Sequence, residues 1–134
     1  MYVTHMITLK DILSYNLERY RGDDTHNILK VAMNEFGTDL NGAILWAQDL
    51  HTKLEQKFHA AMEELPEWDE PLNSQVKEYC NSLGNVVRAN IEWAFESGRY
   101  FGDRGLEIKE TGWMDLMPKK GEKGAGEVDP TSLL

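Results

Sequence analysis

The feature that most constrains the fold is a helical spacing of apolar residues through most of the chain. The clearest stripe recurs every three or four residues and comprises Leu40, Ala43, Ala47, Leu50, Leu54, Phe58, Ala61 and Leu65. Because residues at this spacing share one face of a helix, they predict a long amphipathic helix beginning at Asp39. No segment alternates with the period of a β-strand. The sequence therefore predicts an all-α fold.

Three other segments have the same period. The first helix has an apolar face formed by Met6, Leu9, Leu13, Leu17 and Tyr20. The second is expected to be capped by Asp24 or Thr25 and to end before Gly37. A turn between Pro66 and Pro71 precedes a fourth helix, from about residue 73 to Phe101. Its expected inward residues are Val76, Tyr79, Cys80, Leu83, Val87, Trp93 and Ser97.

The 134 residues fit one domain. We expect a helical unit over residues 1–117, in which Trp113, Met114, Leu116 and Met117 form a short strap. The glycine- and lysine-containing segment 118–134 is expected to be a mobile tail. The helices suit either a small bundle or part of a larger one whose partner helices this chain lacks.

Charge and composition exclude several functions. The formal net charge of −9 argues against a nucleic-acid partner and against an anionic membrane surface. It does not argue against an anionic small substrate, because carboxylate-bound metals reverse the local charge. Apolar runs are too short for a stable membrane anchor, and Cys80 has no disulfide partner. A cytoplasmic location is expected.

Two groups of residues carry candidate chemistry. Asp11, Ser14 and Glu18 share one side of the first helix, where hard oxygen ligands suit Mg²⁺, although such a stripe is also typical of a solvated face. Arg99 and Tyr100 follow near the end of the fourth helix. An arginine fork and a hydroxyl suit a diphosphate, although both residues also fit an ordinary surface.

A third group is interpreted as solvent-facing. His51, Glu55 and His59 lie one helical turn apart, a spacing that can bind transition metals. Lysines are interleaved with them, and no second carboxylate–histidine helix is present, which favours a solvated face. No arrangement of serine, threonine or cysteine predicts a nucleophile, so no residue is assigned as catalytic.

Residues 11–18 (DILSYNLE) and 21–27 (RGDDTHN) together resemble the second metal motif of fungal class I terpene synthases, which reads Asn-Asp-x-x-Ser-x-x-x-Glu. Residues 93–102 (WAFESGRYFG) are similar to that family's Trp-Ser-Phe-Glu-Ser-x-Arg-Tyr-Phe-Gly segment. The resemblance runs from about Leu9 to Pro118. It identifies the chain as similar to the C-terminal part of a basidiomycete-type sesquiterpene synthase.

The resemblance implies an all-α, Mg²⁺-dependent lyase that ionises farnesyl diphosphate and cyclises it to a sesquiterpene. It assigns Ser14 and Glu18 to one metal, with Asp11 as a possible substitute ligand. It assigns Arg99 and Tyr100 to the diphosphate. Lys10 stands where the motif has asparagine, and an ammonium cannot ligate a metal. Two outcomes are therefore open: Lys10 contacts the diphosphate directly, or the metal site is damaged.

The aspartate-rich first motif of the family has no counterpart here. We therefore expect the chain to correspond to the C-terminal part of a longer enzyme. The alternative to an active synthase is a catalytically inactive helical fragment that self-associates through exposed apolar faces.

Overall fold

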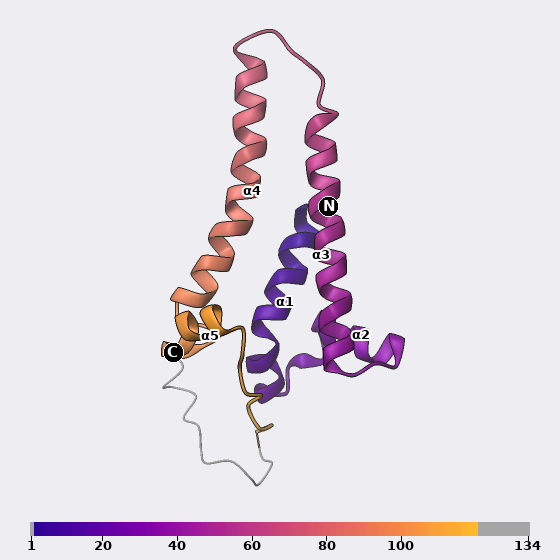
Figure 1. The fold of residues 1–134 in the computed structure, drawn as a ribbon, viewed down its shortest axis with the longest axis vertical. Helices are drawn as coiled ribbons and strands as arrows, with labels where there is room; N and C mark the ends of the chain where they lie inside the picture. The colour runs from indigo at the N-terminus through magenta and orange to yellow at the C-terminus, as the bar shows by residue number, and fades with distance from the viewer. Residues whose placement is uncertain (1, 121–134) are drawn as a thin grey trace.

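The structure, a computed structural model, describes residues 2–120, with side chains described from Thr8 onward. Within this range it contains helices and no strand, which confirms the all-α prediction (Figure 1). The α-helices are α1 (Tyr2–Arg21), α2 (Ile28–Phe36), α3 (Leu40–Glu63), α4 (Leu72–Glu96) and α5 (Gly105–Thr111). Two short 3₁₀ helices, η1 (Asp24–His26) and η2 (Gly102–Arg104), precede α2 and α5.

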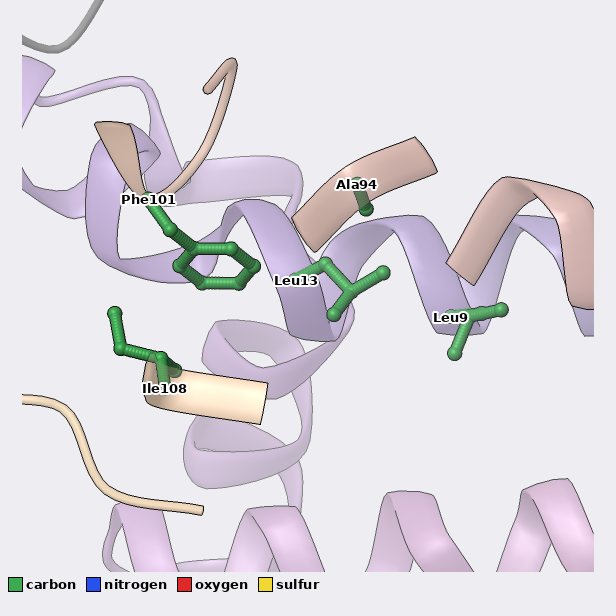
Figure 2. Close-up of a cluster of buried hydrophobic side chains, with 5 residues drawn as sticks. All are labelled: Leu9, Leu13, Ala94, Phe101 and Ile108. Carbon is green, nitrogen blue, oxygen red and sulfur yellow. The ribbon is translucent and has the colours of Figure 1, made fainter. Parts of the chain in front are cut away.

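Helix α1 is the centre of the fold, since it packs against α2, α3 and α4. One buried cluster joins it to α2 and α3 and consists of Tyr15, Leu29, Ala32, Ala43 and Ala47. A second cluster joins it to α4 and α5 and consists of Leu9, Leu13, Ala94, Phe101 and Ile108 (Figure 2). Alanines at the crossings allow the helices to approach closely. Helix α1 is therefore held from two sides.

The predicted helix starts are right for α3 and wrong for α2. The Asp39 carboxylate accepts a hydrogen bond from Gly42 N at 2.8 Å, so Asp39 is the N-cap of α3 as predicted. The N-cap of α2 is Asn27, whose side chain accepts from Leu29 N at 3.0 Å. Asp24, predicted as a cap, lies in η1 instead. Helix α2 ends before Gly37, as expected.

The fourth helix ends earlier than predicted. Helix α4 stops at Glu96 rather than at Phe101, because Gly98 adopts a φ of 71° that breaks the helical path. Beyond it, residues after Arg104, where no helix was predicted, form α5. This helix is only seven residues long, and Ile108 is its buried side chain in the second cluster. A seven-residue helix has too few apolar residues for a helical period to be recognised in the sequence.

Several residues that were predicted to face inward are exposed. Tyr79 and Trp93, both expected to face inward, are 65% and 46% exposed. For Tyr79 the reason lies in the arrangement of α3 and α4, which extend beyond α1 as two arms that residues 64–71 connect (Figure 1). Of the described elements, only α1 and α5 pack substantially against α4. The outer parts of both arms therefore expose apolar side chains.

The C-terminal strap lies along α1, and its anchors are polar rather than aromatic. The Asn16 side chain donates to Asp115 O at 3.0 Å and accepts from Met117 N at 2.9 Å. Met114 packs on the second cluster, whereas Trp113, predicted to pack, is 81% exposed. Of the predicted tail, residues 118–120 are described, and Lys120 N donates to Tyr20 O at 3.1 Å. Residues 121–134 lie outside the described part.

Candidate metal and diphosphate site

The polar stripe of α1 is buried. Ser14 is 2% exposed and Asp11 is 7% exposed, because α2 and η1 cover this side of the helix. Of the two interpretations that spacing left open, a solvated face is therefore wrong at both positions. Buried polar groups cost free energy unless they are hydrogen-bonded, and no buried side-chain nitrogen or oxygen in the described part lacks a partner.

The Glu18 carboxylate is the centre of this polar network. Its Oε1 atom accepts hydrogen bonds from Ser14 Oγ at 2.8 Å and from Lys10 Nζ at 2.6 Å. Its Oε2 atom accepts from Asn27 Nδ2 at 3.0 Å. Ser14 and Glu18 meet because they are one turn apart, and Lys10 reaches Glu18 across two turns. The network fixes the orientation of the carboxylate.

Asp11 has a different environment from the other two predicted metal ligands. Its Oδ2 atom accepts from Ile28 N at 2.9 Å, at the first turn of α2, and its Oδ1 atom lies 3.3 Å from Lys10 Nζ. The carboxylate thus satisfies a helix-terminal N–H that would otherwise be buried without a partner. In this arrangement Asp11 joins α2 to α1.

Arg99 and Tyr100 lie in a turn whose shape depends on two glycines. Gly98 and Gly102 have φ angles of 71° and 58°, a region that L-residues with a side chain rarely adopt. Gly102 N donates to Gly98 O at 3.0 Å and closes the turn. Phe101 points into the second buried cluster and stacks on Phe95 at 4.9 Å between ring centroids. The turn is thereby anchored beside α1.

An open cleft of about 360 Å³ brings the two predicted groups together. It is lined by Lys10, Ser14, Leu17, Glu18, Arg21, Arg99 and Tyr100. Five of the six predicted site residues therefore share one cleft. They come from two segments, residues 10–18 and 99–100, that are more than eighty positions apart in the sequence. Asp11 does not line it.

The electrostatics of the cleft reflect the Lys10–Glu18 pair. Burial acts to raise the pKa of Glu18, but hydrogen bonds from Lys10, Asn27 and Ser14 outweigh it and hold that pKa below its ordinary value. The hydrogen bond to Glu18 is the main cause that raises the pKa of Lys10. Both groups are therefore charged near neutral pH. Arg21 and Arg99 form no ion pair within residues 8–120, so the cleft carries an excess of positive charge.

This pair predicts a pH dependence of stability. The pKa of Glu18 is lower in the folded state than in the unfolded state. The contribution of Glu18 to the free energy of unfolding is therefore complete above the unfolded-state pKa and is lost as pH falls through the folded-state pKa. Lys10 behaves oppositely, and its contribution is lost only as pH rises through its raised pKa. We expect the stability difference between wild type and Glu18→Gln, measured by urea unfolding, to shrink between about pH 7 and about pH 3. A difference that stays constant would contradict this.

Ser14 and Glu18 offer oxygen ligands that suit a divalent cation, whereas Lys10 offers none. Ser14 Oγ and the Glu18 carboxylate are hard oxygen donors of the kind Mg²⁺ prefers. The Lys10 ammonium lies on the same Glu18 oxygen as Ser14 and has no lone pair to offer a metal. Ser14 and Glu18 can therefore hold a cation only if Lys10 moves away from the carboxylate.

Sequence reasoning gave no individual role to two residues of this site. Asn27 is 2% exposed, and its amide donates to Asp11 O at 2.7 Å and to Glu18 Oε2. Arg21, one turn after Leu17, lines the cleft. Both occur in the 21–27 segment that carried the resemblance. Asparagine is a preferred N-cap residue, and this preference was the sequence signal available for Asn27.

The third predicted group lies away from the cleft, on α3. His51 is half-buried, whereas Glu55 and His59 are exposed. Among the described residues, no three histidine, cysteine, aspartate or glutamate side chains are grouped to hold a metal ion. In the same part of the chain, every helix is too short or too polar to cross a bilayer.

Comparisons with known proteins agree with the geometry. Residues 1–57 match the family model described as terpene synthase family 2, C-terminal metal binding. A Delta(6)-protoilludene synthase of Stereum hirsutum is 50% identical over 125 residues, which cover 92% of this chain and 36% of that protein. A Delta(6)-protoilludene synthase of Armillaria ostoyae has the same identity and coverage.

A Delta(6)-protoilludene synthase of Postia placenta is 45% identical over 121 residues, covering 90% of this chain and 35% of that protein. The chain thus spans about a third of the length of the curated relatives it matches. Ser14 and Glu18 both lie within the residues that this family model matches. By motif, fold and sequence identity, the chain is similar to the C-terminal part of fungal sesquiterpene synthases.

Proposed function

We propose that this chain provides the diphosphate-binding wall of a sesquiterpene synthase, a carbon–oxygen lyase that ionises and cyclises farnesyl diphosphate. The observation that carries the proposal is the shared cleft, in which α1 and the turn after α4 bring Ser14, Glu18, Arg99 and Tyr100 together. The names of the relatives support the reaction class. A cytoplasmic location is part of the proposal.

The residues of the cleft suit the first step of such a reaction. Breaking the carbon–oxygen bond places negative charge on the departing diphosphate, and positioned donors lower the barrier by stabilising that charge. Arg99 offers a planar fork of N–H donors, and Tyr100 offers a neutral hydroxyl. A bound Mg²⁺, the proposed cofactor, would supply further positive charge to the leaving group.

Aromatic packing holds these donors in place. The Tyr100 ring meets the Trp93 ring edge-on, with 6.2 Å between centroids. The Arg99 guanidinium carbon lies 6.0 Å from the Trp93 centroid and 5.8 Å from that of Tyr100. Neither contact uses the N–H donors, so the guanidinium can still bind an anion in the cleft.

The test is incubation of the 134-residue chain with farnesyl diphosphate and Mg²⁺, followed by analysis of volatile products against a metal-free control. Release of a hydrocarbon or terpene alcohol only when Mg²⁺ is present would mean that this chain catalyses the reaction alone or as an oligomer. A folded chain that releases none would overturn independent activity and favour the alternative, an inactive helical fragment. Circular dichroism establishes that the chain used is folded.

One observation favours self-association as a second property. Tyr79 is 65% exposed and Val86 is 49% exposed, and their spacing of seven residues puts both on one face of α4. Clustered exposed apolar groups favour burial against another molecule. We expect light scattering after size exclusion to give a mass above the 15.4 kDa of one chain, rising with concentration.

A matched pair of variants tests this expectation. The double variant Tyr79→Lys and Val86→Lys should lower the measured mass, since it places charge on the apolar surface of α4. The change Gln75→Lys adds charge at an exposed polar site of the same helix and should leave the mass unchanged. A mass of one chain at every concentration would contradict self-association.

A further inference from the structure

The most unusual feature of the cleft is a lysine on Glu18, the carboxylate that the motif resemblance assigns to metal binding. Lys10 Nζ lies 2.6 Å from Glu18 Oε1, the oxygen that also accepts from Ser14. The other carboxylate oxygen is bound by Asn27. Both oxygens of Glu18 therefore accept hydrogen bonds from this chain, and Oε1, which Ser14 shares with Lys10, accepts two of the three. A cation held jointly by Ser14 and Glu18 Oε1 would have to displace Lys10.

The lysine also faces the space in which an anion would bind. Its side chain is 48% exposed, and Lys10 lines the cleft together with Arg21 and Arg99. An ammonium has three N–H donors, and the contacts to Glu18 and Asp11 use two of them. At least one donor can thus be directed at a bound anion.

The charges of the cleft favour an anion without any metal. Lys10, Arg21 and Arg99 are cationic, and Glu18 is the single carboxylate among the lining residues. Tyr100 and Ser14 add neutral hydroxyls. The volume of about 360 Å³ lies within the range of about 300–1,000 Å³ that is typical of small-ligand pockets.

We propose that the Lys10 ammonium takes the place of a divalent cation on this wall, so that the cleft binds a diphosphate group without metal. Lys10 then does two things that a metal would otherwise do: it neutralises Glu18 and it contacts the diphosphate. The ligand class rests on the proposed function. The substitution of a lysine for a metal rests on the contacts of Lys10 alone.

The experiment is isothermal titration of inorganic pyrophosphate into the 134-residue chain, with EDTA and then with Mg²⁺. We expect wild type to bind in EDTA and Lys10→Asn to bind about ten-fold or more weakly, the usual effect of a charge-assisted contact. Because asparagine offers a carbonyl oxygen in place of the ammonium, Mg²⁺ should restore binding to Lys10→Asn and add little to wild type.

Two control variants separate charge in the cleft from general effects. Lys10→Arg keeps the cation and should bind in EDTA within a few-fold of wild type. Lys53 makes an ion pair of the same 2.6 Å length with Asp49 on an exposed face of α3, so Lys53→Asn removes an equivalent ion pair outside the cleft. It should bind as wild type does. Circular dichroism of each variant confirms that its helices are intact.

The other outcomes are equally informative. Binding to wild type only in the presence of Mg²⁺ would overturn the role of Lys10 while leaving a diphosphate site in place. Binding in EDTA that Lys10→Asn does not weaken would also overturn it. No binding of pyrophosphate under either condition would overturn both this inference and the proposed function of the cleft.

Discussion

Replacing Gly105 with alanine is expected to destabilise the chain by about 1–3 kcal/mol or more, because the site has no room for a methyl group. A Cβ atom at Gly105 would lie 1.8 Å from the carbonyl oxygen of Phe95, a backbone atom of α4 that cannot rotate away. Helix α5 would have to move, and Ile108 would leave the buried cluster shown in Figure 2. Urea unfolding measures the loss.

The same substitution elsewhere provides the control. At Gly84, inside α4, a new Cβ atom would lie 3.8 Å from the Phe58 ring, an ordinary van der Waals contact. Gly84→Ala should therefore stabilise the chain by about 0.5–1 kcal/mol, since alanine is the better helix former. If both variants changed stability alike, the close approach of α5 to α4 would be wrong.

Replacing Arg99 with alanine is expected to weaken pyrophosphate binding by about ten-fold to one-hundred-fold. The estimate follows from the roughly 1.5–3 kcal/mol that hydrogen bonds to charged groups contribute. Arg99 is exposed, lines the cleft and makes no ion pair within residues 8–120, so its removal should leave the fold intact. The affinity is measured by titration, and the fold by circular dichroism.

Arg104 is the matched control for Arg99. It is also exposed, lies five positions further along the chain, and does not line this cleft. Its guanidinium donates twice to Glu107, at 3.1 Å for each bond. Arg104→Ala should bind pyrophosphate as wild type does. Equal losses in the two variants would mean that overall charge, rather than the position of Arg99, attracts the anion.

The sequence by itself determined the class of fold and most helix positions. The three- to four-residue period of apolar side chains is a local property, and so are caps such as Asp39. The two motifs, residues 11–27 and 93–102, are likewise recognised from residue types and spacing in the sequence alone. From these the all-α fold, the family, and the set of candidate residues could be named.

Only the tertiary structure decided which polar residues are buried and what they contact. The stripe on α1 has the spacing of a solvated face, and α2 and η1 cover it because Asn27 and Asp11 join them to α1. Tyr79 has the spacing of a core residue and is exposed, because no described element covers that part of α4. Burial depends on packing partners, which a periodic pattern does not specify.

The cleft itself is the clearest case of this division. Lys10 and Glu18 are two turns apart on one helix, so their proximity could be inferred from spacing, whereas Arg99 comes from the far end of the described chain. It reaches the cleft because Gly98 ends α4 and Phe101 anchors the following turn against Leu13 and Ile108 (Figure 2). Helical spacing sets which side chains share a face, and only packing between helices sets which faces form a site.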